Sequence, residues 1–359
     1  MNIFIIGMNL TSLILSKALV NIGCIVHVLP YSKKSSNFST RTIGISKSNL
    51  NFINKNILSL SIKKFHNIKK ISIFSERGEE IIKFYNNGEN LFSLVEVNRF
   101  YDVLYNNLKF DKNFKIRKLK SKNFKKDYDL IINCEKNNFI SRKYFSKKFK
   151  KSYNSTAYTA IISHQKIKNI EAKQYFTNFG PLAFLPLAPK ITSVVFSAYK
   201  SSKANDKNFK KLVLNFSKNL NIKKFSKIQK AKLDFSVARN YYFENILSFG
   251  DSLHQIHPLA GQGFNMTIRD LKILINIIKS KIDYGLEVDS SCLKNFEELT
   301  KSKNFIFSEG VNLIQDIFRI KKYFGNNRLN NIIKKIGKNK KINNFFVKIA
   351  DEGLSNFNY

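Results

Sequence analysis

Residues 2–29 read NIFIIGMNLTSLILSKALVNIGCIVHVL, and this stretch decides the fold. The apolar run 2–6 predicts a short buried strand. Apolar residues then recur at helical spacing over 10–19, Gly23 is typical of a helix C-terminus, and 24–29 predicts a second strand. A strand, a helix and a strand in so short a stretch form a βαβ unit, which implies a parallel sheet with a helix on its face.

Strands of two kinds alternate along the rest of the chain. Residues 129–134 and 246–249 are short and largely apolar, which is typical of strands in a parallel sheet. Residues 66–96 and 155–200 instead alternate in short apolar runs separated by turn residues, which predicts antiparallel strands. One parallel sheet is therefore assembled from separated segments, with antiparallel strands inserted between them.

Helices are predicted over 97–109 and after Gly263, and the basic segment 292–359 is mostly helical in pattern. The expected fold class is α/β (α+β mixed): a Rossmann-like domain assembled from discontinuous segments, an inserted antiparallel-sheet domain and a C-terminal helical region. The expected division gives 1–65, 97–150 and 240–290 to the nucleotide-binding domain, 66–96 and 151–239 to the substrate domain, and 291–359 to the helical region.

The formal charge of +37 admits two interpretations. Strongly basic proteins bind nucleic acid or anionic membrane surfaces. In this chain Lys far outnumbers Arg, is scattered in short runs, and accompanies abundant Asn, Ile and Phe, all of which have A/T-rich codons. Because nucleic-acid grooves favour clustered Arg with stacking aromatics, we expect no nucleic-acid partner and attribute most of the charge to composition. Weak attraction to an anionic membrane stays open.

The cysteines and the apolar segments bear on localisation. Cys24, Cys134 and Cys292 are widely spaced and form neither a CxxC pair nor a zinc pattern, which fits a reducing compartment. The apolar start of the chain lacks the basic region of a signal peptide. No stretch reaches the roughly 18 uninterrupted apolar residues of a membrane span. We expect a cytoplasmic protein, with peripheral association with the inner membrane left open.

The turn after the first strand, Gly7-Met8-Asn9-Leu10-Thr11-Ser12, keeps one of the three glycines of the dinucleotide-binding pattern GxGxxG. Asn9 stands where the second glycine lets a pyrophosphate approach the backbone, and Ser12 where the third lets helix and strand pack closely. Asn tolerates left-handed dihedral angles and Ser is small, so the turn can survive both changes. Pro30, however, stands where an acidic residue would bind the ribose.

The stretch 250–266 reads GDSLHQIHPLAGQGFNM and is a more specific signal. A strand delivers Gly250-Asp251, where a carboxylate can accept hydrogen bonds from vicinal hydroxyls. Pro258 begins a rigid turn, and Gly261 and Gly263 then open a helix whose unpaired N–H groups suit an anion. Asp251, His254 and His257 could instead be metal ligands. We favour packing for the histidines, because the stretch is an irregular turn rather than one face of a helix.

Residues 250–270 resemble the second flavin motif of FAD-dependent monooxygenases (the group A flavoprotein monooxygenase superfamily), and more narrowly that of the ring hydroxylases of ubiquinone biosynthesis. The version in these hydroxylases reads close to GDAAHxxHPxAGQGxNxGxxD, from which this chain departs at Ser252, Leu253 and Thr267.

Other segments are similar to that family in the same order along the chain. Residues 41–46 resemble its arginine-bearing segment after the second strand, and 97–99 resemble the start of the helix that touches the cofactor. Residues 180–187 resemble its substrate-domain strand pair, and 310–318 its C-terminal helical region. The middle motif of the family survives in 135–142 only as an acid and an Arg. The changes weaken contacts to the ADP half of FAD, while the isoalloxazine half is intact.

The resemblance implies an FAD-dependent monooxygenase that hydroxylates a prenylated aromatic ring in ubiquinone biosynthesis. NAD(P)H would be the co-substrate that reduces FAD, and dioxygen would give a flavin hydroperoxide that transfers an oxygen atom to the ring. Catalysis is then centred on the flavin, and neither a catalytic side chain nor a metal is expected. The expected cofactor-binding residues are Gly7, Asn9, Ser12, Arg41, Asn98, Arg99, Gly250, Asp251, Pro258, Gly261, Gln262, Gly263 and Asn265.

The expected partners follow from the same resemblance. They are a prenylated phenol or quinone precursor, dioxygen, and a peripheral membrane or a ubiquinone-synthesis complex. Phe and Leu side chains of 175–200 are expected to line the apolar substrate pocket. Two alternatives remain: a degenerate, non-catalytic relative that is a structural partner in the ubiquinone biosynthetic complex, and a flavin reductase without oxygen insertion.

Overall fold

The computed structural model describes residues 1–31, 41–60, 65–85, 89–118, 127–257, 261–324 and 339–354. Its first sheet has six strands in the order β16-β17-β9-β1-β2-β8. All neighbours pair in parallel except β16 and β17, which are antiparallel. The strands are β1 (Asn2–Ile6), β2 (Ile25–Leu29), β8 (Phe114–Ile116), β9 (Leu130–Asn133), β16 (Tyr242–Phe243) and β17 (Ile246–Ser248).

A second, larger sheet has the order β18-β15-β10-β13-β12-β11-β5-β6, with β14 paired to β10. Its neighbours are antiparallel except β11 and β5. The strands are β5 (Lys70–Ser75), β6 (Glu80–Tyr85), β10 (Lys148–His164), β11 (Glu171–Thr177), β12 (Gly180–Ala188), β13 (Ile191–Tyr199), β14 (Ile222–Phe225), β15 (Gln229–Ala238) and β18 (His254–Gln255).

A small antiparallel sheet joins β3 (Thr42–Ser46), β7 (Phe92–Glu96) and β4 (His66–Ile68). β7 pairs with β3 on one side and with β4 on the other. The expected domain boundary at residue 66 therefore separates strands that pair in one sheet. The division into domains stays a prediction.

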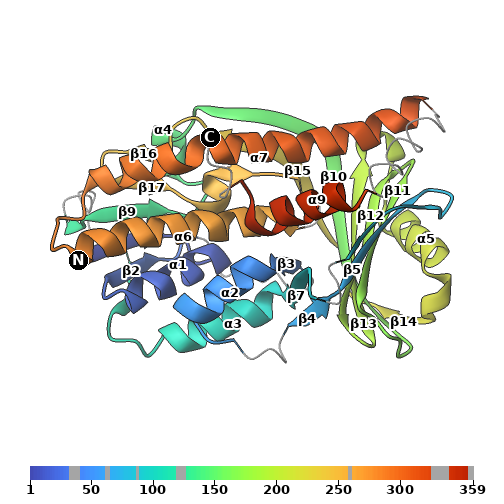
Figure 1. The fold of residues 1–359 in the computed structure, drawn as a ribbon, viewed down its shortest axis with the longest axis horizontal. Helices are drawn as coiled ribbons and strands as arrows, with labels where there is room; N and C mark the ends of the chain where they lie inside the picture. The colour runs from blue at the N-terminus through green and yellow to red at the C-terminus, as the bar shows by residue number, and fades with distance from the viewer. Residues whose placement is uncertain are drawn as a thin grey trace.

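The helices cover these sheets on several sides (Figure 1). In that view α1, α2 and α3 lie together below the first sheet, α6 and α7 run side by side along the molecule, and α5 covers the outer face of the large sheet. The helices are α1 (Leu10–Asn21), α2 (Lys47–Asn56), α3 (Val97–Leu108), α4 (Phe139–Tyr144), α5 (Asp206–Phe216), α6 (Gln262–Asp283), α7 (Ser290–Phe324) and α9 (Lys340–Glu352), with short 3-10 turns η3 (Lys200–Ser202), η4 (Lys218–Leu220) and η5 (Gly250–Ser252).

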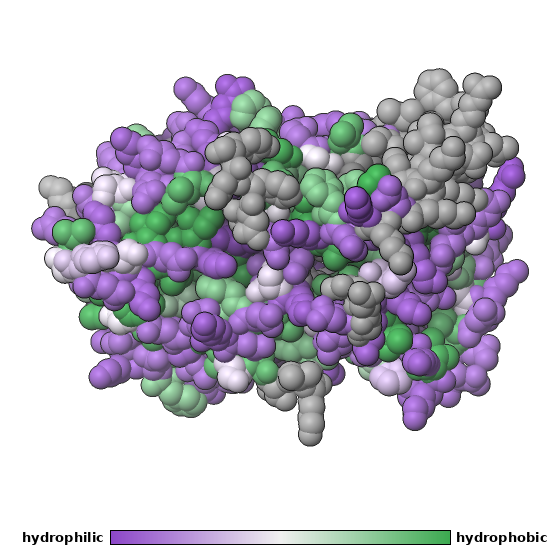
Figure 2. All heavy atoms as spheres, in the orientation of Figure 1, coloured by the Kyte–Doolittle hydropathy of each residue, from purple (hydrophilic) through white to green (hydrophobic). Residues whose placement is uncertain are grey.

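Separate hydrophobic clusters hold the layers together. The largest cluster lies between the parallel strands and α1, α3 and α6. A second lies between α5 and the strands β10, β12 and β13, and a third joins β10 and β15 to α6 and α7. Figure 2 shows hydrophilic residues over most of the visible face, interrupted by smaller hydrophobic patches.

The structure confirms the predicted fold class. The parallel strands at 2–6, 25–29, 130–133 and 246–248 do assemble in one sheet from separated segments, with antiparallel strands inserted between them. α6 begins at Gln262, slightly earlier than predicted, because Gly261 is its left-handed N-cap.

Several elements were not predicted, among them α2, α4, α5, β8, β14 and β15. β8 is too short to give a periodic signal. β10 begins at Lys148 rather than near 155, because its first half is polar and largely exposed.

The second cluster gives a test of packing. Phe209 of α5 is fully buried among the rings of the large sheet, whereas Leu214 on the same helix is 50% exposed. Phe209→Ala should lower the free energy of unfolding by about 3–5 kcal/mol because it leaves a cavity. Leu214→Ala is the matched control and should cost less than about 1 kcal/mol. Urea unfolding measures both, and equal losses would contradict this packing.

Candidate functional site

The motif 250–257 connects the two sheets. β17 ends at Ser248, η5 makes a tight turn, and β18 then pairs with β15 of the large sheet. Gly250 has a φ of +63°, and a Cβ built on it would lie 2.6 Å from Thr11 Cγ2 of α1. Only glycine therefore fits where this turn crosses the first turn of α1.

Asp251 follows directly and is exposed at the carboxyl end of the parallel strands. Glu135, which follows β9, lies close enough for the two carboxylates to influence each other. Burial raises the pKa of Glu135, a hydrogen bond from Asn9 opposes the rise, and the charge of Asp251 adds to it. The two acids can accept hydrogen bonds from hydroxyl groups at this end of the sheet.

The start of α6 is an uncapped helix N-terminus. Gly261 is its N-cap with a φ of +68°, and among the described residues no side-chain cap occupies the amides of the first turn. A Cβ built on Gly261 would lie 3.3 Å from the backbone nitrogen of Gly44 in β3, so the two backbones pass close together. A Cβ built on Gly263 would lie 3.7 Å from Ile256 Cγ1, which is an ordinary van der Waals distance. Pro258 lies outside the described residues.

Asn265 ties this helix start to β3. Its Oδ1 accepts hydrogen bonds from the Ser46 amide at 2.8 Å and from Asn49 Nδ2 at 3.0 Å. Its Nδ2 donates to the Gly44 carbonyl at 2.9 Å. The amide of Asn265 is thus engaged within the protein and fixes the position of Gly261, and its direct contact with a cofactor stays a prediction.

Two histidines of the motif have different surroundings. His254 Nε2 lies 2.6 Å from Asp270 Oδ2, and Asn304 donates to the other oxygen of Asp270, which makes a buried structural network. Among the described residues, no group of three His, Cys, Asp or Glu side chains is arranged to hold a metal ion.

His257 is 1% exposed, and neither ring nitrogen has a hydrogen-bond partner within the described part of the chain. Its ring packs edge-on against Tyr153 of β10, with centroids 4.9 Å apart. Burial lowers the pKa of His257 to about 4, so the imidazole is neutral near pH 7. Gln262 Oε1 is likewise buried without a described partner. Such atoms favour a polar ligand or water beside the helix start.

The turn after β1 differs from expectation. Asn9 has a φ of −117°, which is extended backbone, so its tolerance of left-handed dihedrals has no part here. It is instead the N-cap of α1, where its Oδ1 accepts from the Ser12 amide at 3.0 Å and its own amide donates to Ser12 Oγ at 2.8 Å. Gly7 has a φ of +111°, and Glu135 lies directly against it.

The remaining predicted residues lie where β3 meets α3. The carbonyl of Arg41 accepts a hydrogen bond from the Val97 amide at 2.9 Å, which brings the arginine-bearing segment to the start of α3. Arg41 is exposed and Asn98 half-buried. Arg99 pairs with Glu96 at 3.4 Å on the surface. Tyr153 and Glu135 were not among the predicted site residues, because no local pattern reports which residues of distant strands meet the motif.

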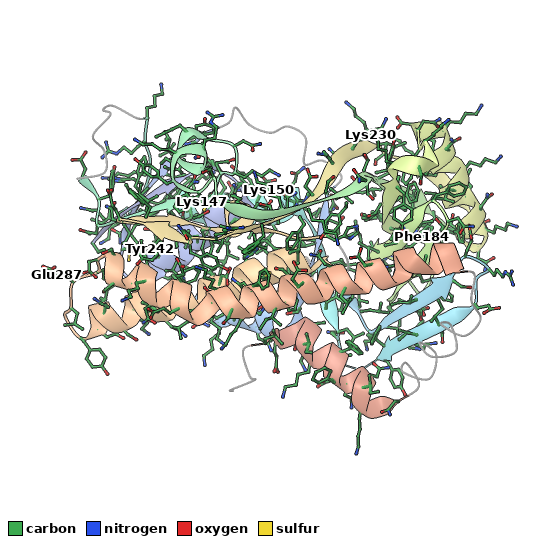
Figure 3. The ribbon with its side chains drawn as sticks, turned by 90° about the horizontal axis from the view of Figure 1, so that it is seen from above. Lys147, Lys150, Phe184, Lys230, Tyr242 and Glu287 are labelled. Carbon is green, nitrogen blue, oxygen red and sulfur yellow. The ribbon has the colours of Figure 1, made fainter. Side chains whose placement is uncertain are left out.

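Aromatic side chains of the large sheet lie on both of its faces, and Tyr153 of β10 lies on the face toward His257. Phe184 and Phe196 pack toward Phe209 of α5, and the expectation that Phe and Leu side chains of 175–200 line the substrate pocket stays a prediction. Figure 3 places Phe184 at the end of the molecule formed by the large sheet. Leu185 and Leu187 alternate to the opposite face and pack toward β4 and β7.

A cavity of about 340 Å³ lies on the α5 side of the same sheet, lined by Lys173, Tyr175, Phe184 and Phe216 among others. Ala172, which alternates with Lys173 along β11, packs toward β4 and β7 on the other face. The sheet therefore separates this cavity from β3 and the start of α6.

The residues fit a flavin at one end of the site better than at the other. Three features fit a planar ring with polar edges: the start of α6, the close backbones of Gly44 and Gly261, and the Gln262 oxygen, which has no hydrogen-bond partner in the described part of the chain. Asp251 is an exposed carboxylate, which can accept hydrogen bonds from hydroxyl groups. At the turn after β1, side chains of Asn9 and Glu135 occupy the place that glycines would leave open.

Comparison with known proteins agrees with this fit. Residues 160–283 match the FAD binding domain family. The structure superposes on p-nitrophenol 4-monooxygenase PnpA of Pseudomonas putida DLL-E4 with a TM-score of 0.79 at 13% identity, covering 99% of this chain and 98% of that one. It also superposes on a single-residue variant of Klebsiella pneumoniae HpxO complexed with FAD, with a TM-score of 0.71 at 12% identity and 99% coverage of both chains. The chain therefore shares the fold of these two proteins, and its residues 160–283 are similar to the FAD binding domain family.

Curated relatives of this chain match over shorter stretches. It is 33% identical over 101 residues to the ubiquinone biosynthesis monooxygenase COQ6 of Dictyostelium discoideum, which is 26% of this chain and 20% of that one. It is 31% identical over 147 residues to the 3-demethoxyubiquinol 3-hydroxylase of Escherichia coli K12, which is 39% of this chain and 38% of the relative. The matched stretches thus span well under half of either relative. Among the described helices of this chain, none combines the length and apolar character that crossing a membrane requires.

The buried His257 predicts an acid-sensitive stability. Its folded pKa of about 4 lies below the ordinary value of 6.5, so between these pH values the unfolded chain binds a proton that the folded protein does not. Stability therefore falls as the pH drops through this window. His257→Phe keeps a ring against Tyr153 and removes the titrating group. On acidification to pH 4, the free energy of unfolding of this variant should therefore fall by up to about 3 kcal/mol less than that of the wild type. Urea unfolding at several pH values measures this, and parallel curves for the two proteins would refute it.

Proposed function

We propose that this chain is an FAD-dependent monooxygenase that hydroxylates a prenylated aromatic ring in ubiquinone biosynthesis, with NAD(P)H as electron donor. The observation that carries the proposal is the glycine-led, uncapped start of α6 held against β3. The relatives named for ubiquinone hydroxylation support the choice of substrate.

The bound FAD would supply the redox chemistry, accepting hydride from NAD(P)H and activating dioxygen. The free amides at Gln262 and Gly263 would stabilise negative charge at the edge of the reduced ring, because a helix N-terminus carries partial positive charge. Asp251 would accept hydrogen bonds from the ribityl hydroxyls. The neutral imidazole of His257 would offer one donor and one acceptor to polar groups beside the ring.

A prenylated substrate favours a membrane surface as its source. α7 exposes Leu299, Ile306 and Leu313, which recur at seven-residue spacing and are 47%, 49% and 63% exposed. α9 exposes Phe345 and Phe346. Apolar side chains on a strongly basic chain favour peripheral contact with an anionic membrane, which we include in the proposal together with association in a ubiquinone-synthesis complex.

A second candidate is a non-catalytic relative that is a structural partner in such a complex. The filled turn at Asn9 and Glu135 favours it. The two candidates differ in a direct observable, because only a catalyst needs to bind flavin. A flavin reductase without oxygen insertion is distinguished by the absence of hydroxylated product from a prenylated phenol.

The purified protein should bind FAD and show the visible absorption of a protein-bound flavin. Asp251→Ala removes the carboxylate proposed to hold the ribityl chain and should weaken flavin binding by about tenfold or more. Asp283→Ala removes a carboxylate from the opposite end of α6 and is the matched control. Fluorescence titration with FAD measures all three proteins. No flavin binding by the wild type would sink the proposal, and equal affinities of the two variants would refute the role of Asp251.

A further inference from the structure

We propose that this chain holds its flavin mainly by the isoalloxazine and ribityl end, and that the ADP half of FAD contributes little to binding. The inference rests on the proposed function, because it concerns the cofactor of that same site. It predicts that riboflavin, which has no phosphate and no adenosine, binds almost as tightly as FAD.

The first step is the place where a dinucleotide pyrophosphate belongs. In a doubly wound sheet this is the crevice outside the carboxyl ends of the strands, at the point where the strand order reverses. β1 has β2 on one side and β9 on the other, so the crevice lies between the ends of β1 and β9. Gly7 and Cys134 are the residues that follow these two strands.

Asn9 bridges this crevice. Its Nδ2 donates to the Cys134 carbonyl at 3.1 Å and to Glu135 Oε1 at 3.3 Å. From the other side, Glu135 Oε1 lies 2.9 Å from where a Cβ on Gly7 would stand. The position where a second glycine would let phosphate reach the backbone is therefore filled by one side chain hydrogen-bonded to another.

The same side chain closes the N-terminus of α1. The Ser12 amide donates to Asn9 Oδ1, and the Asn9 amide donates to Ser12 Oγ, so two of the leading N–H groups are already satisfied. An incoming phosphate would have to displace these bonds. Because the backbone of Asn9 is extended, glycine and asparagine both suit the turn, and the difference between them is the side chain alone.

The residue that follows β2 offers the adenosine half of FAD no contact that would replace those blocked at the pyrophosphate. It is Pro30, which offers neither a carboxylate for ribose hydroxyls nor an N–H. At α6, in contrast, Gly261 leaves the helix start open. The two ends of the site thus differ in the same physical feature: the helix N-terminus has a side-chain cap at α1 and, within the described part of the chain, none at α6.

The experiment titrates the apoprotein with FAD and with riboflavin, measured by flavin fluorescence. The wild type should bind both within about tenfold of each other. Asn9→Gly removes the bridging amide and frees the Ser12 N–H, so FAD affinity should rise about tenfold or more while riboflavin affinity changes by less than about twofold. Gly is a fair N-cap, so this variant should fold, and Asn9→Ala is a second variant with the same expected direction for FAD.

Asn205→Gly is the matched control. Asn205 caps α5 through the same bond to the Asn208 amide, at 2.8 Å, on the far side of the large sheet. It should leave the ratio of FAD to riboflavin affinity unchanged. If FAD binds the wild type about a hundredfold tighter than riboflavin, or if Asn9→Gly leaves the ratio unchanged, this inference fails and the proposed function stands. If neither flavin binds the wild type or Asn9→Gly, the proposed function fails and this inference fails with it.

Discussion

The side-chain amide of Asn265 is the interaction on which the arrangement of the site depends. It joins the first turn of α6 to the backbone of β3 and to Asn49 of α2, and it is 2% exposed. Buried amide hydrogen bonds of this kind are costly to break, because each lost partner leaves a desolvated polar group. Gly261 can lie against Gly44 without a side chain between them only while this joint holds the two elements in place.

The C-terminal helix reinforces the same joint from outside. Asp351 of α9 accepts a hydrogen bond from the Ser48 amide at 2.8 Å, which caps the start of α2. The Ser46 and Ser48 hydroxyls both donate to the Asp351 carbonyl. The segment 42–49 is therefore held by α6 on one side and by α9 on the other. The helical region at the end of the chain takes part in positioning the candidate site, although its sequence pattern alone indicated only a basic amphipathic tail.

Local signals in the sequence were enough for the framework and for the start of α6. Apolar periodicity and Gly23 define the first βαβ unit. Gly261 marks the start of α6, because it is the left-handed N-cap of that helix. The partners of Asn265 could not be predicted, since Ser46 is 219 positions away along the chain. The pairing of β3 with β7 and β4 is non-local for the same reason. Asn9 was correctly identified as a departure, but its bridge to Cys134 depends on the position of β9 relative to β1.

The two ends of the candidate cofactor site differ in how easily a single substitution can close them. The α1 end of a dinucleotide site needs the absence of side chains at two glycine positions, so one substitution such as Asn9 is enough to fill it. The α6 end depends on backbone amides whose position is set by Asn265 and by close approach of Gly261 to Gly44. Many side chains around that helix can change without altering where its amides point. Under the proposed function, this lysine-rich chain keeps the isoalloxazine end of its site while the side chains of Asn9 and Glu135 fill the ADP end.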